Sequence, residues 1–316
     1  MDNNNKTLFQ QVVLLGFQLP RFKIPFFILV LILYSVALSS NVTIVGLVSS
    51  SPSLHHPMFF FLSHLSLSDI ILTIDIVPMM LHGICNGGIT IPMFACITQF
   101  QFFAIALTSE CLLLAVMSYD RYLAICSPFH YITIMGTKLQ YQLVISCWLL
   151  SFTISFVTVL FISKLEFCGS NIINHFFCDF VPLLRLSCSD TSIVEIENLA
   201  LATPTTLFPV LFITATYICI FVTIFRIPSI TGRQKAFSTC SSHLSVVGIF
   251  FGTLVTLYVV PSNGHSLSAN KVLSLLYTLV TPLFNPLIYC LRNQEIRAAF
   301  QRYWQLKCLN KFIGKL

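Results

Sequence analysis

The sequence predicts an all-α membrane protein, a bundle of seven transmembrane helices followed by a short amphipathic helix. Hydrophobic residues make up 56% of the 316 residues and charged residues only 9%, at a mean hydropathy of +0.86. Soluble domains carry roughly a quarter charged residues, so this chain cannot cover a globular surface in water. An open β-sheet cannot replace the helices, because its edge groups would stay unsatisfied in lipid.

Seven windows along the chain are apolar over the length of about 20 residues that a helix needs to cross a bilayer. They cover residues 25–49, 58–80, 93–117, 141–163, 199–225, 236–260 and 272–291. The second window contains Asp69 and Asp75, the third contains Glu110, and the other five contain no Asp, Glu, Lys or Arg. The windows divide the chain into three parts. These are a tail of residues 1–24, a bundle of residues 25–291 and a terminal segment of residues 292–316.

The terminal segment predicts a short amphipathic helix on the membrane surface. Its apolar residues share one helical face, with Arg297 and Arg302 elsewhere, and an apolar stripe with basic flanks binds the membrane interface. The stripe consists of Ile296, Ala299, Phe300, Tyr303 and Trp304. Cys308 is a candidate palmitoylation site.

Lys and Arg predict the orientation, because they gather on the cytoplasmic side of membrane proteins. With the N-terminus outside, eleven of the 17 lie inside and the other six outside. The inner residues are Arg121, Lys138, Arg226, Arg233, Lys235, Arg292, Arg297, Arg302, Lys307, Lys311 and Lys315. Asn5 begins a glycosylation acceptor in the polar tail, which agrees with this orientation. We therefore expect a multi-pass plasma-membrane protein with an extracellular N-terminus and a cytoplasmic C-terminus.

Cysteines cluster on the predicted outer side, where an oxidising compartment favours disulfides. Cys168, Cys178 and Cys188 lie in the longest loop, and Cys96 lies at the outer start of the third window. The first choice of pairing is Cys96–Cys178 with Cys168–Cys188, which would staple the loop over the helices. A zinc site that includes the nearby His175 is the alternative, although the spacing has no C-x-x-C form.

Asp69 and Glu110 fall near the middle of their windows, where a charge is costly and marks a functional site. Two carboxylates at this depth call for a shared cation or a proton. One interpretation is a small-cation site with sodium as the expected ion. The other is that one or both carboxyls are protonated and hydrogen-bonded. Both interpretations stay open, and no other cofactor is predicted.

The tripeptide Asp120-Arg121-Tyr122 ends the third helix on the predicted inner side. Arg121 keeps its charge, so it needs a partner, and Asp120 is the nearest one. Such a pair can hold one arrangement of helices and be released in another. The alternative is an ordinary interfacial Arg that reaches for lipid headgroups.

Several longer motifs together resemble those of vertebrate odorant receptors, with the tetrapod-type (class II) subgroup as the closer fit. The resemblance covers nearly the whole chain, from residue 16 to residue 293. Its motifs are residues 57–63 (PMFFFLS), 117–126 (MSYDRYLAIC), 175–179 (HFFCD), 186–188 (LSC), 235–244 (KAFSTCSSHL) and 285–289 (NPLIY). Two departures are Phe251, where the family usually has Tyr, and Pro228 in the loop before the sixth helix.

The resemblance implies a ligand pocket in the outer half of the bundle, capped by the stapled loop. Its expected lining residues are Phe103, Ala104, Leu107, Thr108, Thr205, Thr206, Leu254, Tyr258 and Thr278. This set is mostly apolar with a few hydroxyls and no fixed charge, which suits a small neutral volatile ligand.

The resemblance also implies signalling through a heterotrimeric G protein with a stimulatory, olfactory-type α subunit, which raises cAMP. The expected switch residues are Asp120, Arg121, Tyr122, Tyr217, His243, Asn285, Pro286 and Tyr289. Activation would loosen the Asp120–Arg121 pair and move the inner end of the sixth helix outward.

Other classes of function fit the sequence less well. A channel or transporter would need a polar pore or repeat symmetry, and neither is visible. A receptor for hormone amines would need a carboxylate where Phe103 stands. No nucleophile–base constellation indicates an enzyme, and no nucleic-acid partner is expected.

Overall fold

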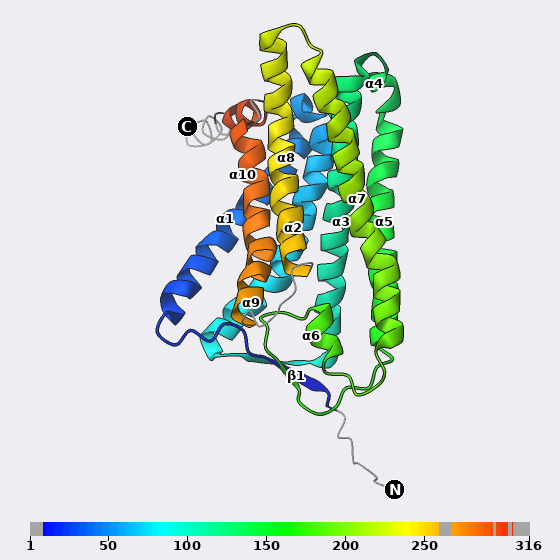
Figure 1. The fold of residues 1–316 in the computed structure, drawn as a ribbon. Coiled ribbons are helices and arrows are strands. Elements are labelled where there is room, and N and C mark those ends of the chain that lie inside the picture. Colours follow the sequence, from blue (N-terminus) through cyan, green and yellow to red (C-terminus); the bar gives the residue numbers. More distant parts are fainter. Residues whose placement is uncertain (1–8, 259–266, 293–294, 303–304, 306–316) are drawn as a thin grey trace.

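The computed structural model describes residues 9–258, 267–292, 295–302 and 305. Among these residues, seven helical segments lie side by side and form a bundle (Figure 1). They are α1 (Lys23–Ser50), α2 (Pro57–Asn86), α3 (Met93–Cys126), α5 (Thr137–Ile162), α7 (Ser192–Phe225), α8 (Ile230–Tyr258) and the joined helices α9 (Leu267–Leu275), η2 (Leu276–Val280) and α10 (Thr281–Arg292). The predicted seven-helix bundle is confirmed.

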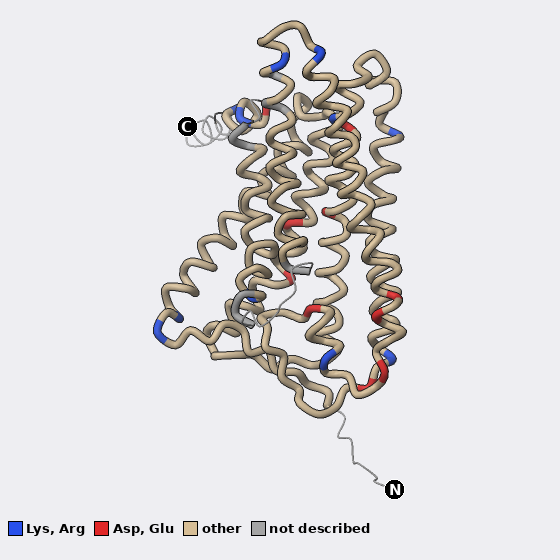
Figure 2. Tube along the Cα trace, viewed as in Figure 1, with Lys and Arg blue, Asp and Glu red and all other residues tan. Residues whose placement is uncertain are grey.

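The composition and exposure of the helices fit a membrane. Six segments have the length and apolar composition to cross one, and α8 adds a shorter apolar stretch, Cys240–Thr256, within the described residues. The outward faces stay apolar, since Ile32, Leu149 and Phe208 are 55%, 61% and 63% exposed. An apolar surface this extensive is stable only against lipid or another protein. Figure 2 shows Lys and Arg towards the two ends of the bundle and a few acidic residues in its middle.

The helices are longer than the apolar windows that predicted them. α2 continues past residue 80 to Asn86, and Gly87 then adopts a left-handed conformation (φ 72°) that ends the helix. α7 begins at Ser192 rather than at residue 199, and α3 runs beyond Asp120 to Cys126. Hydropathy marks only the part of a helix that lies in hydrocarbon, because polar residues are favourable in the interfacial turns.

The seventh segment contains a π-helical turn, η2, between α9 and α10. Pro282, in the first turn of α10, has no N–H to donate, so the α-helical ladder is interrupted at this point. The Pro282 carbonyl accepts a hydrogen bond of 2.8 Å from Nδ2 of Asn41, which is 1% exposed. This bond ties α1 to the irregular part of the seventh segment.

The apolar core forms two clusters along the bundle. One contains Phe61, Ile220 and Tyr289, and the other contains Phe176 and Tyr277, each at most 2% exposed. The partly buried Leu107 packs against both clusters. The first cluster lies towards one end of the bundle and the second cluster towards the other end.

One end of the bundle, here called the cap end, is closed by a small sheet and a long loop. The strand β1 (Gln11–Leu14) lies in the middle of the sheet. It pairs antiparallel with β2 (Ile89–Pro92) and parallel with β3 (Ile172–Ile173). The loop also forms the short helix α6 (Phe180–Leu184), whose first N–H donates to the Asp179 side chain at 2.8 Å. This sheet was not predicted, because strands so short carry no periodic pattern.

The opposite end, here called the α4 end, contains the short helix α4 (Pro128–Ile134) between α3 and α5 (Figure 1). The turn η1 (Pro52–Leu54) connects α1 to α2, and residues 226–229 connect α7 to α8. These connections leave the ends of α3, α7 and α8 close to one another.

The segment after α10 is helical where it is described, over residues 295–302. Ile296 and Ala299 are 2% and 4% exposed, whereas Arg297 is exposed. Ile296 and Ala299 thus form a buried apolar face, as the predicted amphipathic helix requires, whereas Phe300 of the same predicted stripe is 42% exposed. Tyr303, Trp304 and Cys308 lie outside the described residues.

Candidate functional site

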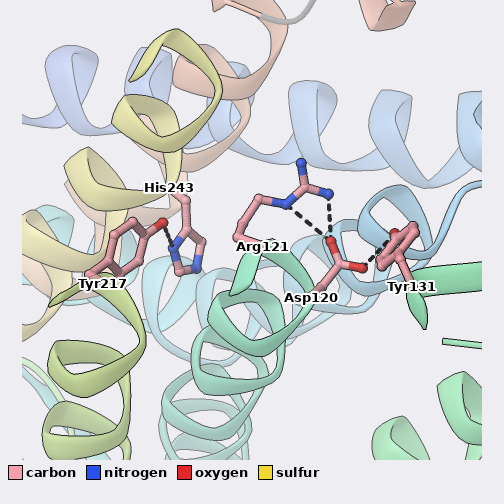
Figure 3. A network of polar contacts seen from close by, with 5 residues as sticks. All are labelled: Asp120, Arg121, Tyr131, Tyr217 and His243. Atoms are coloured by element: carbon pink, nitrogen blue, oxygen red, sulfur yellow. Dashed lines mark hydrogen bonds and ion pairs between the residues drawn. The ribbon is translucent and has the colours of Figure 1, made fainter. Parts of the chain in front are cut away.

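The α4 end of α3 carries an ion pair with a third partner. Arg121 Nη2 lies 2.5 Å from Asp120 Oδ2, and Nε lies 3.1 Å from the same oxygen. The Tyr131 hydroxyl, from α4, donates to Asp120 Oδ1 at 2.8 Å. Asp120 is fully buried, and both of its carboxylate oxygens accept hydrogen bonds, one from Arg121 and the other from Tyr131 (Figure 3). Burial and the neighbouring Asp120 carboxylate raise the pKa of Tyr131, so it remains a hydrogen-bond donor.

A second polar pair joins α7 to α8. The Tyr217 hydroxyl lies 2.8 Å from Nδ1 of His243, and their rings are stacked. In Figure 3, Arg121 lies between this pair and Asp120. The Tyr289 hydroxyl is buried and makes no hydrogen bond with any described residue. Tyr122, the remaining switch residue of this group, packs its ring against Tyr119 at 6.5 Å.

The two predicted membrane carboxyls meet in the middle of the bundle. Asp69 of α2 and Glu110 of α3 are each 0% exposed. Asn285 of α10, directly before Pro286, donates from Nδ2 to both carboxyl oxygens of Asp69, at 3.2 and 3.1 Å. Both oxygens of Glu110 are buried, and no described residue donates to them apart from the adjoining Asp69 carboxyl, with which Glu110 can share a proton. Two adjoining buried carboxyls fit a monovalent cation or a shared proton.

The cap end contains both predicted disulfides, Cys96–Cys178 and Cys168–Cys188, with Cα atoms 5.5 and 5.8 Å apart. The first ties the long loop to α3, and the second closes the loop on itself. Because these bonds use the four thiols, the zinc alternative loses its ligands. His175 instead stacks on neighbouring aromatic rings, and burial together with the nearby Lys271 lowers its pKa to about 3.

The aromatic part of the predicted pocket lies beneath this cap. Phe103 of α3 is 2% exposed. Its ring centroid lies 5.2 Å from that of Phe177 in the loop and 5.9 Å from that of Tyr277 in η2. These rings join α3, the loop and the seventh segment. Phe177 and Tyr277 were not among the predicted lining residues.

The predicted hydroxyls of the pocket differ in their hydrogen bonding. Thr205, Thr206 and Thr278 donate to carbonyl groups of their own helices at 2.9, 3.1 and 2.8 Å. Thr108 is half-buried and makes no hydrogen bond with a described residue, so its hydroxyl is available to a ligand.

The remaining predicted lining residues either are apolar or lie outside the part of the chain that the structure describes. Leu254 of α8 is 4% exposed, and Ala104 and Leu107 of α3 are half-buried. The side chain of Tyr258 and residues 259–266 lie outside the described part of the chain.

Two residues that hold the site together were missed from the sequence. Gln99 of α3, 3% exposed, donates from Nε2 to the Asp75 carbonyl at 3.0 Å and accepts from the Cys178 N–H at 2.9 Å. It thereby fixes the loop to both α2 and α3. Tyr131 was missed as well, because a tyrosine in a short connection gives no signal of its distant partner.

Comparison with known proteins places this architecture in one family. The family model described as olfactory receptor matches residues 30–307. The human olfactory receptor 11A1 is 42% identical over 307 residues, which is 97% of each chain. The human olfactory receptor 6B2 and the mouse olfactory receptor 5P60 are each 44% identical. They align with 96% of this chain and with 97% and 95% of their own length. With its seven-helix bundle, stapled cap and paired Asp120–Arg121, the chain belongs to the olfactory receptor family.

Proposed function

We propose that this chain is an odorant receptor that binds small, mostly apolar volatile molecules beneath the cap and activates a stimulatory, olfactory-type G protein, raising cAMP. The observation that carries the proposal is the buried Asp120–Arg121 pair, held by Tyr131 at the α4 end. This ion pair stabilises the resting arrangement of the helices at the end of the bundle opposite the cap.

The proposed orientation puts the cap outside the cell and the α4 end in the cytoplasm of a plasma-membrane protein. The two disulfides at the cap end support it, because disulfides persist in oxidising compartments. The basic connections at the other end support it as well. Asn5, the proposed glycosylation site, lies outside the described residues.

The ligand class follows from the predicted lining. Phe103, Leu107 and Leu254 offer apolar surface, and Thr108 offers one hydroxyl that is not bonded to a described residue. A volatile ligand gains its affinity there mainly from burial, at about 0.3–1.5 kcal/mol per heavy atom, so we expect micromolar potency.

Signalling requires only that the ligand bind the active arrangement more tightly than the resting one. In that arrangement the Asp120–Arg121 pair loosens and the α4 end of α8 moves outward. The hydroxyls of Tyr217 and Tyr289 then become partners for Arg121. The cleft that opens receives the C-terminal helix of the G-protein α subunit.

Asp69, Glu110 and Asn285 would hold a sodium ion in the resting arrangement. The burial of Glu110 beside Asp69 supports this site, since two adjoining carboxylates in a membrane are costly without a cation. The ion would stabilise the packing of α2 against α3 and α10.

The proposal is tested by a cAMP reporter screen of volatile odorants in cells that display the receptor. We expect agonists that raise cAMP through the wild type and fail through Arg121→Ala. Arg226→Ala, on an exposed position at the same end, is the matched control and should respond normally. Equal responses of wild type and Arg121→Ala at equal surface expression would refute the proposed switch.

A further inference from the structure

A polar cluster joins α3, α5 and α7 near the cap end, beside the predicted pocket. Gln101 of α3 donates from Nε2 to the Ser155 hydroxyl at 2.8 Å, and Thr158 donates to Oε1 of Glu197 at 3.0 Å. Ser155 and Thr158 are 2% and 4% exposed and lie one helical turn apart on the buried face of α5. The two bonded pairs are therefore neighbours in the interface of these three helices.

The cluster has unpaired acceptors. Oε1 of Gln101 and Oε2 of Glu197 are buried and have no hydrogen-bond partner among the described residues. The Ser155 hydroxyl already donates to the Ser151 carbonyl at 2.8 Å, and Thr158 donates to Glu197. Buried polar atoms in folded proteins are nearly always paired, so two orphaned acceptors at one place indicate a missing donor.

The position of the cluster connects it to the ligand. Gln101 lies one turn before Ala104 and two turns before Thr108 on the same side of α3, and both of those residues belong to the predicted lining. Glu197 lies near the start of α7, in the turns before residue 199, where its bond to Thr158 brings its carboxyl into the interface with α5.

We propose that Gln101 and Glu197 form a polar anchor that selects odorants carrying a hydroxyl group, such as alcohols and phenols. This inference rests on the proposed function and names its ligand class. A hydroxyl carries one donor hydrogen and can pair with one of these two oxygens, whereas ketones, esters and ethers present only acceptors. A neutral hydroxyl also enters the apolar bundle at a much lower desolvation cost than an ammonium group.

The test is a cAMP screen in which each medium-chain alcohol and each phenol is paired with its own methyl ether. The ether keeps the carbon skeleton and loses the donor. We expect alcohols or phenols among the agonists, each about tenfold or more potent than its ether, as one hydrogen bond to a charged or buried acceptor provides. The inference is overturned if no alcohol or phenol activates the receptor, or if ethers match their parent alcohols.

Variants separate a binding role from a structural one. Glu197→Gln replaces the unpaired oxygen by an amide donor and should abolish the preference for alcohols over ethers. Thr158→Val frees a second oxygen of Glu197 and should preserve the preference. Glu195→Gln, two residues away on the exposed side of α7, is the matched control and should behave as the wild type. A preference unchanged in Glu197→Gln at normal surface expression would overturn the inference.

Failure of this inference differs from failure of the proposed function. If ethers or esters raise cAMP as strongly as alcohols and the response still requires Arg121, the receptor signals as proposed but lacks the hydroxyl anchor. If responses persist in Arg121→Ala, the proposed switch itself is wrong.

Discussion

Removing the hydroxyl of Tyr131 should make the receptor more active without ligand. Tyr131→Phe deletes the 2.8 Å hydrogen bond to Asp120 and leaves the ring in place. A hydrogen bond to a charged group is worth about 1.5–3 kcal/mol, and the lower value applies because Tyr131 is only half-buried. A loss of about 1.4 kcal/mol from the resting state multiplies the ratio of active to resting receptor by about ten. A resting receptor with roughly 1% active molecules would then have about 10%.

The assay is basal cAMP in cells that express wild type and variant at equal surface density. Tyr141→Phe is the matched control, since that tyrosine packs its ring on Phe60 at the same end of the bundle. We expect basal cAMP to rise in Tyr131→Phe and to stay unchanged in the control. An unchanged or lower basal level in Tyr131→Phe would show that the bond does not hold the resting arrangement.

Four further predictions concern the cap and the buried carboxyls. Cys96→Ser should lower the free energy of unfolding by about 1 kcal/mol more than loss of the Cys168–Cys188 disulfide, because the first disulfide spans 82 residues and the second 20. Thermal denaturation of the purified variants measures the difference, and equal losses of stability would contradict the prediction. Between pH 6.5 and about 3, His175 stays neutral when the cap is closed but takes up a proton when the cap opens. Acidification should therefore destabilise the cap by roughly 1.4 kcal/mol per pH unit. Hydrogen exchange of the cap amides should show this loss of stability in the wild type and not in His175→Phe. Burial raises the pKa of Asp179 to about 6, so this group favours the closed cap as pH falls below 6, and its replacement by Asn should make the acid sensitivity steeper. Sodium should lower agonist potency in the wild type and have no effect in Asp69→Asn, and an equal sodium effect in both would remove the proposed site.

The crossing helices could be predicted from sequence because lipid imposes a simple requirement. A segment of about 20 apolar residues must be helical there, and the chain shows this pattern seven times. The extra turns of α2 and α7 could not be predicted, since they lie where polar residues are favourable. The sheet around β1 was missed because its strands, Gln11–Leu14 and Ile89–Pro92, are short and far apart in the chain.

Some contacts of the candidate site could likewise be predicted from the sequence, and others could not. The pairings Cys96–Cys178 and Asp120–Arg121 could be predicted, because each partner is of a type that requires another. Gln99, Gln101 and Tyr131 could not, because a neutral polar side chain in an apolar helix or a short loop does not indicate its partner. Their roles appear only when α2, α3, α4 and the loop are packed together.

In the proposed mechanism, a ligand beneath the cap opens the opposite end of the bundle. The most direct measurement is the distance between spin labels at Lys138 of α5 and Ile230 of α8, with and without an agonist and the G protein. We expect a population with a longer distance that appears only when both are bound and that requires an intact pocket. A distance distribution that stays the same while cAMP signalling is intact would contradict it.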